Sequence, residues 1–226
     1  MKKLLFVSSL LIMLMAASMA MADQVTLVGG FGPYQTGGGG EFTLLPDAGL
    51  KWIPNSYVPG VTRDIVQNGT FQSFCAEFDE AIYPNATYDA TISQVSIFSG
   101  KPLTLGAAWL YLHFSMGDLP GYDYSRTATP VNETQQLQDA IWYFMGVASD
   151  PNNQFSALGL SHGGFTPNND QLSVAVLNLW DVGFVGSRDH RIQDVLINTA
   201  PEPATMLLLG SGLVGIGVYV RRRFKK

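Results

Sequence analysis

The stretch Gln138-Asp139-Ala140-Ile141-Trp142 lies in a segment, 133–145, whose apolar residues recur at helical spacing. Five of them stand at positions i, i+3, i+4, i+7 and i+8, which predicts a helix with one buried face: Leu137, Ala140, Ile141, Phe144 and Met145. Gln138 stands at the edge of that face, and Trp142 follows it by four residues, on the same side. Asn132 is a suitable N-cap and Gly146 a suitable stop, so we expect the helix to lie between them.

Cys75 is the only cysteine of the chain and lies in a second informative stretch, 71–78. This stretch has the composition of a strand, in which alternate residues share a face. Phe74 lies on the more apolar face, which we expect to be buried, so Cys75 is expected to point away from the core. A single cysteine in an exported chain has no internal disulfide partner. The thiol is therefore free, paired with another chain, or bonded to another group such as a glutamine carboxamide.

Phe74-Cys75 in a strand, followed by Gln138-x-Ala-Ile-Trp142, resembles the thioester domains of bacterial surface adhesins. The resemblance covers 71–146, although Leu137 stands where that family usually has a threonine. It implies an internal thioester between Cys75 and Gln138, with Trp142 and Phe74 keeping water away. An amine or a sugar hydroxyl on a ligand would then take the acyl group and release the thiol.

Formation of a thioester needs the thiol of Cys75 in its thiolate form, and so a lowered pKa or a nearby base. Glu77, Asp79 and His113 are candidates for that base, and the sequence does not rank them. Carboxylates close to the thiol would raise its pKa, which acts against bond formation.

The rest of the central chain indicates mixed secondary structure. Alternating polar and apolar residues predict strands at 24–28, 41–45, 87–98 and 191–198, and helical spacing predicts a helix at 102–116. Residues 172–180 are compatible with helix or strand, and the preceding Asn169 and Asp170 favour helix. The glycine-rich stretches 29–33 and 37–40 are expected to be loops. The predicted fold class is α+β: a mainly antiparallel β-sandwich or barrel-like domain carrying a small helical pair.

The N-terminus has the three parts of a secretory signal peptide. Lys2 and Lys3 are followed by an apolar run, 4–15, and then by the small-x-small sequence Ala20-Met21-Ala22. We therefore expect residues 1–22 to be removed by the secretion machinery and residues 23–200 to form the exported domain.

The C-terminus, 201–226, has three ordered features. Pro201-Glu202-Pro203 comes first, an apolar run at 204–220 follows, and the basic cluster Arg221-Arg222-Arg223 stops transfer across the membrane. Seventeen helical residues span about 25 Å, near the lower limit for a transmembrane helix. This order resembles the PEP-CTERM sorting signal of Gram-negative bacteria. The resemblance implies processing by an exosortase and delivery to the cell surface or extracellular matrix, often beside exopolysaccharide production.

Charge and composition exclude several kinds of protein. Between residues 23 and 199 six basic residues face 17 acidic ones, so this surface should repel nucleic acid. The three histidines have no metal-ligand spacing, no nucleophile signature surrounds Cys75, and no cofactor motif is present, so we expect no enzyme. The alternative to a thioester is a non-covalent structural or exopolysaccharide-associated matrix protein with a free cysteine. Its contact points would be aromatic residues in loops: Trp52, Tyr57, Tyr122 and Tyr124.

Overall fold

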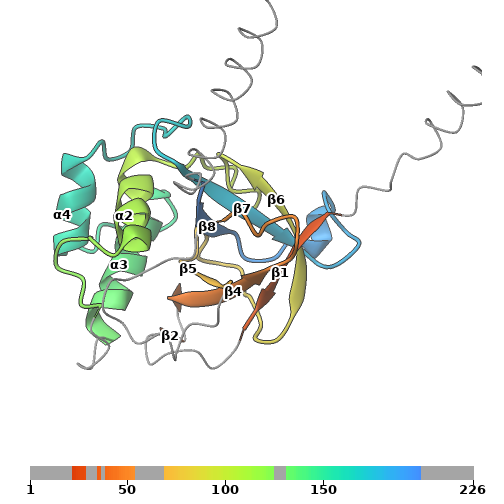
Figure 1. The fold of residues 1–226 in the computed structure, drawn as a ribbon. Helices are drawn as coiled ribbons and strands as arrows, with labels where there is room; N and C mark the ends of the chain where they lie inside the picture. The colour runs from red at the N-terminus through yellow and green to blue at the C-terminus, as the bar shows by residue number, and fades with distance from the viewer. Residues whose placement is uncertain (1–21, 29–34, 37–38, 54–68, 125–130, 200–226) are drawn as a thin grey trace, which may run out of the picture.

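The computed structural model describes residues 22–28, 35–36, 39–53, 69–124 and 131–199. Six strands form one antiparallel sheet in the order β5-β4-β1-β6-β7-β8 (Figure 1). The strands are β1 (Asp23–Leu27), β4 (Phe42–Pro46), β5 (Phe71–Ser73), β6 (Thr87–Ser93), β7 (Val174–Trp180) and β8 (Val195–Asn198). A separate two-stranded ribbon joins β2 (Gln35–Thr36) to β3 (Gly39–Gly40).

The two edge strands of the sheet, β5 and β8, come together and nearly close it into a barrel. Just after β5, the Phe74 carbonyl accepts a hydrogen bond from the Leu196 N–H at 3.1 Å, and the Ala76 N–H donates to the Asp194 carbonyl at 2.8 Å. Cys75 and Val195 are opposite each other in this antiparallel bridge. The predicted barrel-like antiparallel sheet is thus confirmed in its main features.

Three helices gather at one side of the sheet: α2 (Leu105–Met116), α3 (Val131–Phe144) and α4 (Gln154–Ser161) (Figure 1). Thr104 caps α2 with its side chain, and Gly117 ends it at a φ of 78°, in the left-handed region that favours glycine. A short 3-10 turn, η1 (Arg188–His190), precedes β8. The two predicted helices, 102–116 and 133–145, are confirmed with slightly shifted ends.

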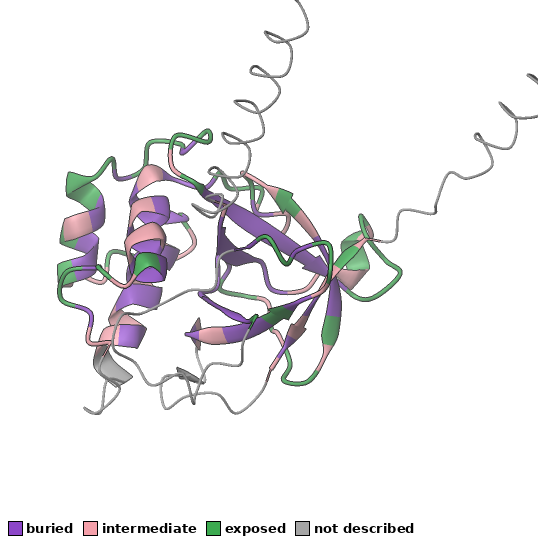
Figure 2. Cartoon of the chain, in the orientation of Figure 1, coloured by how far each residue is buried: buried purple, intermediate pink, exposed green. Residues whose placement is uncertain are grey.

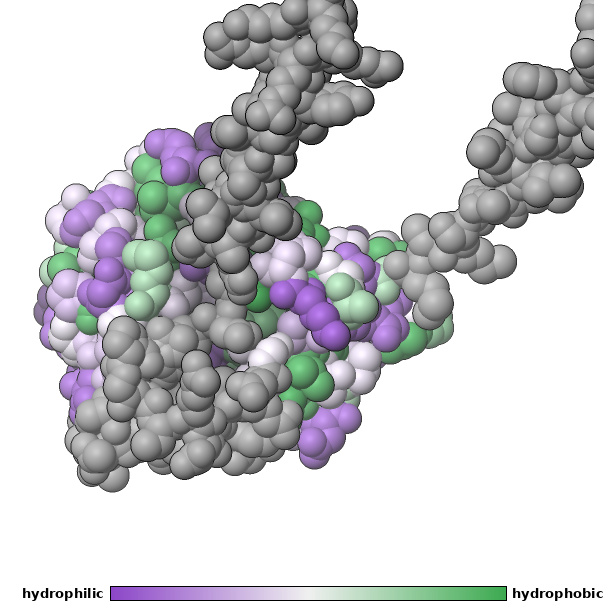
Figure 3. Space-filling view, in the orientation of Figure 1, coloured by the Kyte–Doolittle hydropathy of each residue, from purple (hydrophilic) through white to green (hydrophobic). Residues whose placement is uncertain are grey.

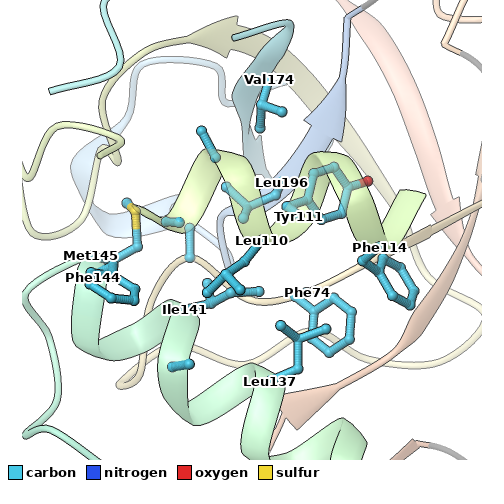
Figure 4. Packing of buried hydrophobic residues seen from close by; sticks show 14 of the residues in the cluster. Phe74, Leu110, Tyr111, Phe114, Leu137, Ile141, Phe144, Met145, Val174 and Leu196 are labelled. Atoms are coloured by element: carbon cyan, nitrogen blue, oxygen red, sulfur yellow. The ribbon is translucent and has the colours of Figure 1, made fainter. Parts of the chain in front are cut away.

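Apolar side chains form two clusters, one on each face of the sheet. Figure 2 shows buried residues along both the strands and the helices. The outer core lies between the sheet and the helices, and Figure 4 shows Phe74 there beside side chains of α2 and α3. The inner core lies within the curved sheet and includes Leu44, Phe71, Leu177 and Val195. Both faces of β7 and β8 are therefore buried.

Several local predictions were wrong. Residues 174–180 form β7 and not a helix, because every side chain of Val-Ala-Val-Leu-Asn-Leu-Trp is buried, as in a central strand packed on both faces. The helix α4 was not predicted. Asn132 lies inside α3 and is not its N-cap. Gly39 and Gly40 pair with β2 instead of forming a loop, and the strand that begins at Phe71 ends at Ser73, before its bridge at Cys75.

The two terminal signals, including the predicted transmembrane helix at 204–220, lie outside the described residues. Within the part of the chain that the structure describes, no helix has the length and apolar character needed to cross a bilayer.

Candidate functional site

The fold brings Cys75 and Gln138 together across 63 positions of sequence. The backbone N–H of Cys75 donates to Oε1 of Gln138 at 2.9 Å, and Nε2 of Gln138 donates to the backbone carbonyl of Cys75 at 2.9 Å. Both residues are buried, with Gln138 fully enclosed and Cys75 only 4% exposed. The helix face of α3 and the end of β5 thus meet at this pair of residues.

The sheet leaves a vacant pairing position for the Gln138 carboxamide. Because Phe74 and Ala76 bond to β8, the N–H and C=O of Cys75 point to the opposite edge. The register of β4 with β5, which pairs Phe42 with Ser73, would place Gly40 opposite Cys75. The side chain of Gln138 is inserted between them instead, and its Oε1 also accepts the Gly40 N–H at 3.1 Å. We call this inserted carboxamide the Gln138 wedge.

Gly39 must be a glycine for the wedge to fit. Its φ is 115°, in the left-handed region. A Cβ atom at this position would lie 2.8 Å from Cγ of Gln138 and 2.8 Å from Cη2 of Trp142. The glycine-rich stretch that the sequence predicted to be a plain loop is therefore part of the site.

The thiol of Cys75 lies inside the molecule. It shares a face with its bridge partner Val195 of the inner core, since opposed residues in an antiparallel pair project to the same side. The expectation that Cys75 points away from the core was wrong, because both faces of the sheet are buried. Burial raises the pKa of the thiol above its ordinary range, which favours the protonated form.

Trp142 and Phe78 stand beside this pair. The Trp142 Nε1–H donates to the Glu77 carbonyl at 2.7 Å, and the Trp142 and Phe78 rings pack edge to face with centroids 4.8 Å apart. Phe74, in contrast, belongs to the outer core and packs on Phe114. Both Trp142 and Phe78 line the pocket described next. Phe78, which is 56% exposed, was not predicted from the sequence to belong to the site.

A pocket of about 680 Å³ adjoins the site, and Cys75 is one of the residues that line it. Its apolar lining comes from Leu27, Phe42, Ala81, Ile82 and Pro84, next to the aromatic rings of Phe78 and Trp142. The charged residues among its described lining are Glu80 and Asp139, both acidic. Elsewhere, hydrophilic and hydrophobic residues are interspersed over the face seen in Figure 3.

The three candidate bases have different surroundings. Glu77 is buried, its Oε1 accepts the Ser99 N–H at 3.0 Å, and burial raises its pKa. Asp79 is exposed. His113 pairs with Asp118 at 2.9 Å and is not among the described residues that line the pocket.

A buried acid that was not singled out from the sequence lies immediately before β8, where its carbonyl accepts the Ala76 N–H: Asp194. Asp194 accepts hydrogen bonds from the Ser96 hydroxyl at 2.8 Å and from the Ile97 N–H at 2.7 Å, both through Oδ2. Its other oxygen is buried without a hydrogen-bond partner in the structure. Burial, opposed in part by these hydrogen bonds, raises the pKa of Asp194 to about 6.

The aromatic residues suggested as contact points are not all on the surface. Tyr122 is buried, and its hydroxyl lies 3.1 Å from Oε2 of Glu41, to which it donates. Tyr124 is half-buried, Trp52 is 44% exposed, and Tyr57 lies outside the described residues. Among the described side chains, no three of the His, Cys, Asp and Glu type are grouped as metal ligands.

Comparison with known proteins identifies the C-terminal segment. A family model of the PEP-CTERM protein-sorting motif matches residues 199–223, which include Pro201-Glu202-Pro203 and the arginine cluster. No curated protein and no solved structure matches the chain. The motif supports the conclusion that this is an exported protein sorted by an exosortase.

Proposed function

We propose that Cys75 and Gln138 form an internal thioester and that this exported protein uses it once, to bind covalently to a ligand outside the cell. The observation that carries the proposal is the Gln138 wedge. The carboxamide of Gln138 is held on both backbone groups of Cys75, at 2.9 Å each.

The orientation of the wedge suits attack by the thiol. The paired hydrogen bonds to the Cys75 backbone hold the carboxamide near the plane of the sheet, whereas side chains stand roughly perpendicular to a sheet. The thiol of Cys75 is therefore expected to lie beside one face of the planar amide. A nucleophile must approach a carbonyl carbon from such a face, so this orientation suits the reaction.

The reaction balances without a further reagent. The sulfur of Cys75 bonds to Cδ of Gln138, the C–N bond breaks, and the thiol proton leaves with the nitrogen as ammonia. In the second step an amine of the ligand bonds to the same carbon and the C–S bond breaks. The thiol regains a proton from the amine, and the ligand stays attached through an amide. The protein acts once and is not an enzyme.

Burial of Cys75 acts against formation of the thioester but favours its survival. The raised pKa of the thiol makes the thiolate scarce, so burial acts against bond formation. The completed thioester is neutral and suits an apolar site. Trp142 and Phe78 pack on each other and line the pocket beside Cys75, where they would limit the access of water to the bond.

The lining of the pocket favours an amine over a sugar hydroxyl. Glu80 and Asp139 are the charged residues of the described lining, and they would attract a cationic amine. The apolar residues of the lining would accommodate an alkyl chain such as that of a lysine side chain. The sorting motif would direct the protein to the cell surface or the matrix, where it would meet such a ligand.

Methylamine capture by the exported protein tests the proposal. A thioester should convert the Gln138 side chain to its N-methyl amide, as located by peptide mass mapping, and should release one thiol. Cys75→Ala should capture none. Thiol titration must follow unfolding, because a thiol that is 4% exposed reacts slowly in the native state whether or not it is bonded. An unmodified Gln138 together with a full thiol titre before treatment would instead indicate the non-covalent matrix protein.

A further inference from the structure

Two backbone N–H groups from separate parts of the chain point at one oxygen atom, Oε1 of Gln138. The Cys75 N–H lies 2.9 Å from it and the Gly40 N–H 3.1 Å. The other atom of the carboxamide, Nε2, is occupied by the Cys75 carbonyl. All three contacts are buried.

The Gly40 N–H reaches this oxygen only because of the local backbone. Gly39 and Gly40 have φ values of 115° and 118°, which side-chain-bearing residues rarely adopt. Gly39 packs directly on Cγ of Gln138 and on the Trp142 ring, so that the next amide is directed toward the oxygen. The β2–β3 ribbon thus supplies a donor that the main sheet does not provide.

We propose that the Gly40 and Cys75 N–H groups form an oxyanion hole for the thioester, so that this protein catalyses both formation and opening of its own bond. The inference rests on the proposed function. When sulfur adds to Cδ, the π electrons of the C=O bond move to Oε1, which becomes an alkoxide held by both N–H groups. The charge returns to re-form C=O as ammonia leaves. The same oxygen gains and loses charge again when an amine attacks the thioester.

This arrangement has the properties that make such donors effective. Backbone N–H groups held by a sheet and a ribbon need no reorganisation as charge develops, and water is excluded around them. The donors lie 2.9 and 3.1 Å from the ground-state oxygen, so both stay within hydrogen-bond reach of an oxyanion that forms with little movement of that atom.

The test compares Gly39→Ala with Gly69→Ala in the exported protein. Gly69 also has a positive φ, 87°, but an added Cβ there meets nothing within 4 Å, so it controls for backbone strain alone. Gly39→Ala should push the ribbon off Gln138 and slow methylamine capture by about 100-fold. Gly69→Ala should capture methylamine at the wild-type rate.

A second variant removes the donor without changing the shape. An ester in place of the Gly40 amide, introduced with glycolic acid, should also slow capture and should raise the infrared stretching frequency of the thioester carbonyl, because one hydrogen bond is lost. Wild-type rates and frequency in this ester variant would overturn the oxyanion hole while leaving the thioester intact. Absence of methylamine capture by the wild-type protein would instead refute the proposed function, and the oxyanion hole with it.

Discussion

Replacing Gln138 by methionine tests the wedge without relying on any covalent chemistry. Methionine keeps the length of the side chain but has no amide. Its introduction leaves three buried backbone groups without partners: the Cys75 N–H, the Cys75 carbonyl and the Gly40 N–H. Each such group costs about 1–3 kcal/mol when it stays dry. Some water will enter from the adjoining pocket, so we expect a total loss of about 3–5 kcal/mol in the free energy of unfolding, relative to a chain with the Gln138 amide intact.

Cys75→Ala is the matched control for this experiment. It abolishes any thioester, as Gln138→Met does, but it keeps all three hydrogen bonds, because none of them involves the Cys75 sulfur. Urea unfolding of the two variants therefore isolates the wedge. We expect Gln138→Met to be the less stable by about 2–4 kcal/mol. Equal stability of the two variants would show that Gln138 does not hold β5 to the β2–β3 ribbon.

Three further predictions concern neighbouring groups and the tail. Trp142→Phe should lower the free energy of unfolding by only about 1 kcal/mol, because the Glu77 carbonyl keeps a second donor, the Gln193 side chain at 2.8 Å. A loss in urea unfolding as large as that of Gln138→Met would contradict this prediction. The pKa of Asp194 rises from 3.8 to about 6, so its proton stabilises the fold below pH about 4, and this contribution is lost as the pH rises to about 6. Asp194→Asn should remove about 2–3 kcal/mol of this dependence, and an unchanged pH profile of unfolding would refute the assignment. Alanine in place of Pro201-Glu202-Pro203 should leave the protein in the membrane fraction, and release equal to that of the wild type would overturn the sorting prediction.

The helices and most strands could be predicted because their patterns are local. Residues 133–145 show helical spacing, and the structure forms α3 over most of that range. The stretch 172–180 was misassigned because it is buried on both faces, so that no alternation is visible, and only its β-branched residues favoured a strand. The helix α4 has the sequence QFSALGLS, which is too short to display a period, and its Asn153 cap is identified only from the structure.

The candidate site was predicted in part. The sequence paired Cys75 with Gln138 through a resemblance, and the structure places the two in contact through the Cys75 backbone. The role of Gly39 and Gly40 could not be predicted, because it depends on the register of β4 with β5 and on the vacancy opposite Cys75. The burial of the thiol also depends on closure of the sheet by β8, a contact between residues about 120 positions apart.

The exact mass of the exported protein tests the central claim most directly. The account predicts that the wild-type chain is lighter than its processed sequence by one ammonia, and that Cys75→Ala and Gln138→Ala each have their full sequence mass. A wild-type mass equal to that of the processed sequence would contradict the thioester and leave Gln138 with a structural role alone.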